Sequence, residues 1–366
     1  MAANIPTTLA KDVLPTLAEV YESPDEFLGM LDIGTLNLIC AVGLPGADEL
    51  DVARYLAILN LWAKRIQAIT ARNLSEFKRN PHKYELSEAY WRMLALTSLL
   101  QSEFSIRYNQ DRMDKEDWSD SRDILIHGLL GPTRAGTCSS LPVLVVAIGR
   151  RLGYPLHLVR TLGHLFVRWE RFDSVERWNI EFGGNGMGHH SDDYYRKWPA
   201  EWPPDLIRIE AQRGARRAFL RNLTSGEEFS VGLSMRGHCL EANGRWDEAL
   251  EAYARASQFA PIHPAYPVYA DELRSKMRAA DGLLSQLCKA VPTFDPNRPI
   301  PGIVQVNVRQ PADGLMIQLA GFVKKRPPRY PAPPPASLAV RKIVNDLVAK
   351  LHPLAGFKPT TPPDDL

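Results

Sequence analysis

Long apolar runs, a secretory signal and a strong charge of one sign are all missing from this sequence. No eighteen consecutive apolar residues occur, and the longest apolar stretch, near residues 141–148, is too short to cross a bilayer. The first residues lack the basic start and apolar middle of a signal peptide. Because 44 Lys and Arg residues balance 42 Asp and Glu residues, no broad nucleic-acid-binding surface is expected. We therefore expect a cytoplasmic protein that binds neither membranes nor nucleic acid.

Cysteine is also scarce, with four residues scattered along 366 positions and no CxxC pair. In a reducing compartment these residues are expected to be free thiols. Cys40, Cys239 and Cys288 lie in apolar or amphipathic stretches, where a buried cysteine acts as a small hydrophobe. Cys138 differs, because it lies between a glycine-containing turn and an apolar run.

No metal site and no cofactor are expected. Two adjacent histidines, His189 and His190, precede Asp192 and Asp193, but they lack the spacing of metal ligands on regular structure. We interpret this stretch as a solvated loop.

The chain divides into four regions by composition and periodicity. Residues 1–110 carry amphipathic helical patterns, at 51–73 and 87–108, and predict a helical N-terminal layer. Residues 111–204 form the predicted core, and residues 205–290 are helical again. Residues 291–366 are rich in proline and are interpreted as a tail. Together these regions predict the α+β class.

The core combines one apolar helix with short strands. A helix is expected from residue 138 to about 152, capped by Thr137 and ended by Gly153. Pro142 would fall just past its first turn and remove one intrahelical hydrogen bond. Residues 156–160, 164–169 and 177–182 alternate and are rich in valine and aromatic side chains, so they predict antiparallel strands. The helix should therefore be buried against a small antiparallel sheet.

One helical repeat is visible at residues 229–263. Small, aromatic and terminating residues occupy the positions typical of a tetratricopeptide repeat; they are Gly237, Gly244, Trp246, Ala249, Tyr253, Ala256 and Pro261. A single repeat cannot bury its own apolar face, so it should pack on neighbouring helices and offer a surface to a protein partner.

A candidate nucleophile, base and orienting group occur in that order along the core. The thiol of Cys138 is expected at a helix start, where the helix dipole and free N–H groups favour a thiolate. His164 opens a strand after Gly163 and can take the thiol proton, with His157 on the preceding strand as its competitor. Asn179 and Glu181 lie two residues apart on the next strand, so they share a face, and either can orient the imidazole.

The motifs Gly-Thr-Cys-Ser-Ser-Leu-Pro, Gly-Arg-Arg-Leu-Gly-Tyr-Pro and Gly-His-Leu-Phe-Val-Arg-Trp resemble those of bacterial transglutaminase-like proteins, which belong to the papain-like cysteine enzyme superfamily. The resemblance covers about residues 32–198, and the repeat extends it to about 261. It implies a Cys-His-Asp triad, with Cys138 as nucleophile and His164 as base. Glu181 stands where the family has aspartate, so Asn179 stays an alternative. Gln101 is a candidate oxyanion donor in this superfamily, although its helix also favours a structural role.

Two hypotheses follow from the sequence. In the favoured one, the protein is a cysteine-dependent acyltransferase or peptidase acting on a protein or peptide amide. In the other, it is a catalytically inactive scaffold or regulator that binds a protein partner through its repeat.

Overall fold

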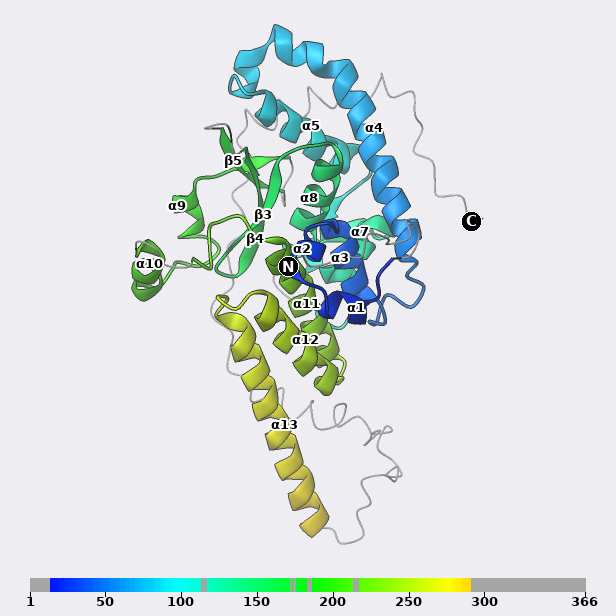
Figure 1. Ribbon diagram of the computed structural model, residues 1–366, viewed down its shortest axis with the longest axis vertical. Coiled ribbons are helices and arrows are strands. Elements are labelled where there is room, and N and C mark those ends of the chain that lie inside the picture. The colour runs from blue at the N-terminus through cyan, green and yellow to red at the C-terminus, as the bar shows by residue number, and fades with distance from the viewer. Residues whose placement is uncertain are drawn as a thin grey trace, which may run out of the picture.

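The apolar segment after Cys138 forms helix α8 (Leu141–Arg151), and the rest of the chain packs around it. Every residue of α8 from Leu141 to Gly149 is buried, because the segment is apolar on all sides. One side contacts strands β3 (Leu156–Thr161) and β4 (His164–Glu170). Other sides contact helices α3 (Ile33–Ala41), α4 (Val52–Arg79), α5 (Glu88–Ser102) and α7 (Ile126–Leu130). The fold is therefore α+β, with helices predominating (Figure 1).

This computed structural model describes residues 14–112, 117–171, 173, 176–182, 186–212 and 217–290, and of Asp25 and residues 282–290 it describes only the backbone. The predicted proline-rich tail and the side chain of Cys288 lie outside the described residues. Besides those above, the helices and 3-10 turns are α1 (Leu17–Tyr21), α2 (Asp25–Leu28), η1 (Pro81–Tyr84), η2 (Gln110–Arg112), α6 (Ser121–Ile124), α9 (Asp192–Tyr195), α10 (Pro204–Ala211), α11 (Ser225–Ala242), α12 (Trp246–Phe259) and α13 (Ala265–Ala290).

The N-terminal helices begin at acidic or hydroxyl caps. Asp32, Asp51 and Ser87 accept backbone N–H groups of the first turns of α3, α4 and α5. Helix α4 continues beyond the predicted range to Arg79, whereas α5 ends at Ser102, earlier than predicted. After α5 the chain turns and residues 107–108 form strand β1 (Arg107–Tyr108), which pairs in parallel with β2 (Ala135–Gly136).

The three predicted strands form an antiparallel sheet with the order β3-β4-β5-β6. Strands β5 (Arg177–Glu181) and β6 (Gly188–His189) complete it, and β6 was not expected from its glycine-rich sequence. Thr161 pairs with His164 across a two-residue turn in which Gly163 adopts φ +74°. This tight turn makes His164 the first residue of β4.

Helix α8 begins three residues later than predicted. The backbone N–H groups of Ser140 and Leu141 both donate to the carbonyl of Thr137, which closes a turn before the helix. Pro142 is consequently at the second helical position, where a missing N–H costs no intrahelical hydrogen bond. The predicted hydrogen-bond loss is therefore wrong, and Cys138 lies in the turn that precedes the helix.

Helices α11 and α12 form the closely packed helix pair expected at residues 229–263, and Gly244 adopts φ +73° in the turn between them. Helix α11 also packs on α3. The chain continues as the single long helix α13, which packs on α12 and then extends away from the rest of the fold (Figure 1).

Within the described residues, no helix is both long enough and apolar enough to cross a bilayer.

We predict that Gly237→Ala destabilises the protein by loosening the α11–α12 pair. A Cβ atom at this position would overlap the ring of Tyr253, which is buried and held by both helices. Overpacking of this kind lowers the free energy of unfolding by about 2 kcal/mol. Denaturant unfolding measures this change, with Glu251→Ala on the exposed face of α12 as the control. A G237A protein as stable as the control would contradict the close packing.

Candidate active site

The turn that carries Cys138 is hydrogen-bonded to the end of α6. The hydroxyl of Thr137 donates to the carbonyl of Asp123 at 3.2 Å, and the hydroxyl of Ser139 donates to the carbonyl of Ile124 at 3.1 Å. Gly136 precedes the turn because a Cβ atom there would collide with side-chain atoms of Ser140 and Leu129. The half-buried thiol is thus held in place by its neighbours on both sides.

Within the described part of the chain, the backbone N–H of Cys138 donates no hydrogen bond. A backbone N–H beside a nucleophile is available to an oxyanion that forms on the attacked carbonyl.

His164 joins the thiol to a buried carboxylate. Its side chain lies within interaction distance of the thiol of Cys138, and its Nε2 lies 2.9 Å from Oε2 of Glu181. Since Glu181 occupies Nε2, the nitrogen left for the thiol is Nδ1. His164 is 9% exposed and Glu181 is 6% exposed, so water is largely excluded from their contact. Three separate segments therefore meet in the order thiol, imidazole, carboxylate.

This environment favours the protonated imidazole. Burial alone would lower the pKa of His164, but the charge of Glu181 and the hydrogen bonds to Cys138 and Glu181 outweigh it and raise the pKa to about 10. The stability that this shift contributes is complete below pH 6.5 and is lost as the pH rises through about 10. At neutral pH an imidazolium thus faces the thiol of Cys138.

Aromatic side chains from α9 and the following loop enclose the pair. Trp198 packs with its ring edge-on to His164 at a centroid distance of 4.6 Å. The hydroxyl of Tyr195 donates to Oε2 of Glu181 at 3.2 Å. From the sequence alone, residues 191–198 are not linked to the site, because nothing local indicates which end of the sheet this segment reaches.

Asn179, the alternative third residue, lies on the same face as Glu181 but contacts Arg168. The Nε of Arg168 donates to Oδ1 of Asn179 at 2.7 Å, and Nδ2 of Asn179 donates to Oδ1 of Asp192 at 2.8 Å. The strand register explains the difference, because Asn179 is paired with Arg168, four residues along β4 from His164. Glu181, not Asn179, therefore reaches the imidazole.

The competing histidine, His157, is placed elsewhere. It is paired with Arg168 on the neighbouring strand, roughly 13 Å along the sheet from the His164 end, and its Nε2 lies 3.3 Å from the carbonyl of Glu170. Burial, together with the charge of Arg150, lowers its pKa.

Gln101 lies near the end of α5, and its Oε1 accepts the backbone N–H of Gly186 at 3.1 Å. This contact ties the loop before β6 to the helix, and a role as oxyanion donor stays a prediction.

The residues considered as metal ligands from the sequence alone are His189, His190, Asp192 and Asp193. Among the described residues, no group of three or more His, Cys, Asp or Glu side chains is arranged to hold a metal ion. His189 belongs to β6 and packs against Tyr90 and Trp178, while His190 stacks on Tyr194 at 4.0 Å. This segment is therefore more ordered than the solvated loop that we expected.

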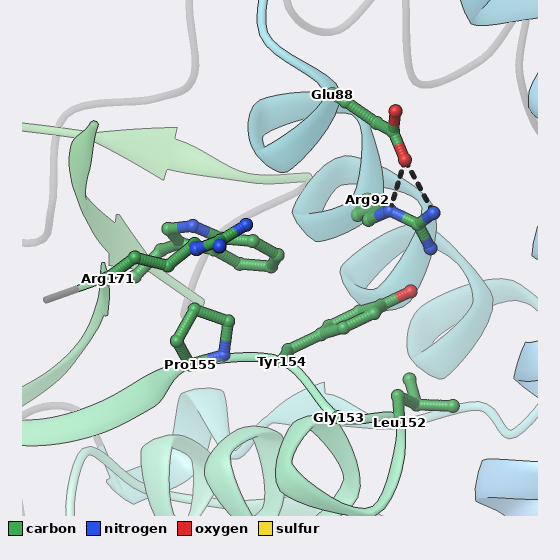
Figure 2. A pocket seen from close by; sticks show the side chains of 8 residues that line it. Glu88, Arg92, Leu152, Gly153, Tyr154, Pro155 and Arg171 are labelled. Atoms are coloured by element: carbon green, nitrogen blue, oxygen red, sulfur yellow. Dashed lines mark hydrogen bonds and ion pairs between the residues drawn. The ribbon is translucent and has the colours of Figure 1, made fainter. Parts of the chain in front are cut away.

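A separate cavity of about 620 Å³ lies at the other end of α8. Figure 2 shows Arg92 paired with Glu88 above the ring of Tyr154, and Pro155 and Arg171 to the left of that ring. Gly153 and Tyr154 follow the C-terminal end of α8, about 16 Å along the helix from its N-terminal end. The cavity and the Cys138 cluster are therefore different features.

Comparisons with protein-family models, with curated proteins and with solved structures find no match to this chain. The chemistry of the site accordingly rests on its own residues and contacts.

We predict that Glu181, and not Asn179, controls the titration of His164. Glu181→Gln removes the charge that favours the imidazolium, so the pKa of His164 should fall from about 10 by at least two pH units. Histidine-labelled NMR measures this titration directly.

Asn179→Ala is the matched variant, since it lies two residues away on the same strand face. It should leave the titration of His164 in place while lowering the free energy of unfolding by about 2 kcal/mol, because buried Arg168 loses a partner. A reversed result, with His164 responding to Asn179, would refute the assignment.

Proposed function

We propose that this protein is a cysteine-dependent acyltransferase or amide hydrolase with a transglutaminase-like core. The observation that carries the proposal is the contact of Cys138, His164 and Glu181, which come from a turn, the start of β4 and the end of β5. A buried histidine between a half-buried thiol and a buried carboxylate is the arrangement that nucleophilic cysteine chemistry needs.

The reaction begins with attack of the Cys138 thiolate on the carbonyl carbon of a carboxamide. The carbonyl oxygen becomes an oxyanion, to which the N–H of Cys138 can donate. When the tetrahedral intermediate collapses, the C–N bond breaks and the His164 imidazolium gives its proton to the leaving amine. The product of this half-reaction is a thioester on Cys138.

The second half-reaction resolves the thioester. His164, now neutral, removes a proton from water or from an incoming amine, which attacks the thioester carbon and releases the thiolate of Cys138. Water gives a carboxylic acid, and an amine gives a new amide. Glu181 orients the ring and stabilises its charge.

The proposed substrate is a carboxamide on a protein or peptide. The exposure of Cys138 supports this class, because the thiol is half-buried whereas His164 and Glu181 are buried behind it. We further propose that the α11–α12 pair is a tetratricopeptide-type repeat offering a surface to a protein partner, and that the protein acts in the cytoplasm, where its thiols stay reduced.

Cys138 should react with iodoacetamide much faster than the buried cysteines at pH 6. In the proposed mechanism the His164 imidazolium activates Cys138, whereas burial raises the pKa of both Cys40 and Cys239 to about 12. Mass spectrometry of each cysteine over time, in a Cys288→Ser background, gives the rates. We expect at least a tenfold excess at Cys138 that His164→Ala abolishes; equal rates would exclude an activated thiol.

The acyl-transfer step should be visible as incorporation of monodansylcadaverine into casein. Cys138→Ser and His164→Ala should both abolish it, because the first removes the nucleophile and the second the proton carrier. Fluorescence in the casein band measures the product. Full incorporation by either variant would refute the proposed roles, and an unreactive Cys138 without incorporation by the wild type would favour the scaffold hypothesis.

A further inference from the structure

Oxygen Oε2 of Glu181 accepts two hydrogen bonds. The imidazole of His164 lies 2.9 Å away, and the hydroxyl of Tyr195 lies 3.2 Å away. Tyr195 is fully buried and its ring stacks on Phe166 at 3.8 Å with an interplanar angle of 4°. A buried aromatic ring that is packed so closely holds its hydroxyl at a defined point.

We propose that Tyr195 is a positioning residue, which fixes the Glu181 carboxylate and through it the charge and orientation of His164. This inference rests on the proposed function. A glutamate has one more rotatable bond than an aspartate, so a carboxylate held by His164 alone would retain more freedom. The second donor restrains it and also stabilises its charge where water is excluded.

Tyr195 remains a donor over the whole working pH range. Burial, followed by the charge of Glu181 and their hydrogen bond, raises the pKa of Tyr195 well above its ordinary value of 10. The hydroxyl therefore keeps its proton when the imidazole and the thiol exchange theirs.

The other titratable groups around Glu181 come from each neighbouring element. They are His164 on β4, Cys138 in contact with that histidine, His190 after β6, and Tyr194 beside Tyr195 on α9. Among the described residues, the hydroxyl of Tyr194 has no hydrogen-bond partner, although its ring packs on His190 and Trp198. Tyr194→Phe therefore removes a hydroxyl of the same kind from the adjacent position without breaking a bond to Glu181.

The test is the pH profile of Cys138 alkylation by iodoacetamide in Tyr195→Phe and in Tyr194→Phe. Without its second donor the Glu181 carboxylate is less stable as an anion and holds the imidazolium less well. The acid limb of the Tyr195→Phe profile should therefore move up by about one pH unit, with rates on that limb up to about tenfold lower. The Tyr194→Phe profile should coincide with the wild type.

A second experiment distinguishes a positioning role of Tyr195 from a purely structural role. In a Glu181→Gln background, Tyr195→Phe should cause no further change of the profile, because its effect passes through the carboxylate. Thermal unfolding of each variant shows that it is folded. If Tyr195→Phe lowers stability while its profile coincides with that of Tyr194→Phe, the inference is overturned. If the wild-type thiol itself lacks reactivity at low pH, the proposed function fails and this inference falls with it.

Discussion

The burial of helix α8 is the constraint on which the rest of the structure depends. Its side chains are apolar in every direction, so one side needs a sheet and the others need helices. Strands β3 and β4 run along α8, and the turn before the helix thereby meets the start of β4. The contact between Cys138 and His164 is thus a consequence of how the core must be covered.

Buried polar side chains on one sheet face take part in two successive groups of contacts. One joins His164 to Glu181, and the other joins Arg168 to Asn179 and Asp192. An unpaired charge in either place would be strongly destabilising, because the sheet face is covered by the aromatic residues of α9 and the following loop. In the second group Arg168 and Asn179 hold Asp192, the first residue of α9, and α9 carries Tyr195 to Glu181. The structural network therefore supports the candidate catalytic one.

Much of this arrangement could be predicted from local pattern. Alternating apolar residues predict the strands that carry His164 and Glu181, and the same alternation places Asn179 and Glu181 on one strand face. Which of the two contacts His164 depends on the register between β4 and β5, which places Asn179 opposite Arg168. A register depends on both strands, so the sequence of one strand does not reveal it. The start of α8 was misplaced for a similar reason. The turn at Cys138 is held by the distant carbonyls of Asp123 and Ile124, which no local pattern reveals.

The glutamate at position 181 illustrates how a flexible carboxylate can be held in one position. A longer carboxylate reaches further but orients less well, and a single hydrogen bond to imidazole does not restrict its rotation. Here the required restraint comes from a tyrosine on a different element, whose ring is fixed by stacking on Phe166 and whose hydroxyl stays protonated. We therefore describe the proposed site as four interacting groups, which are the thiol of Cys138, the imidazole of His164, the carboxylate of Glu181 and the phenol of Tyr195.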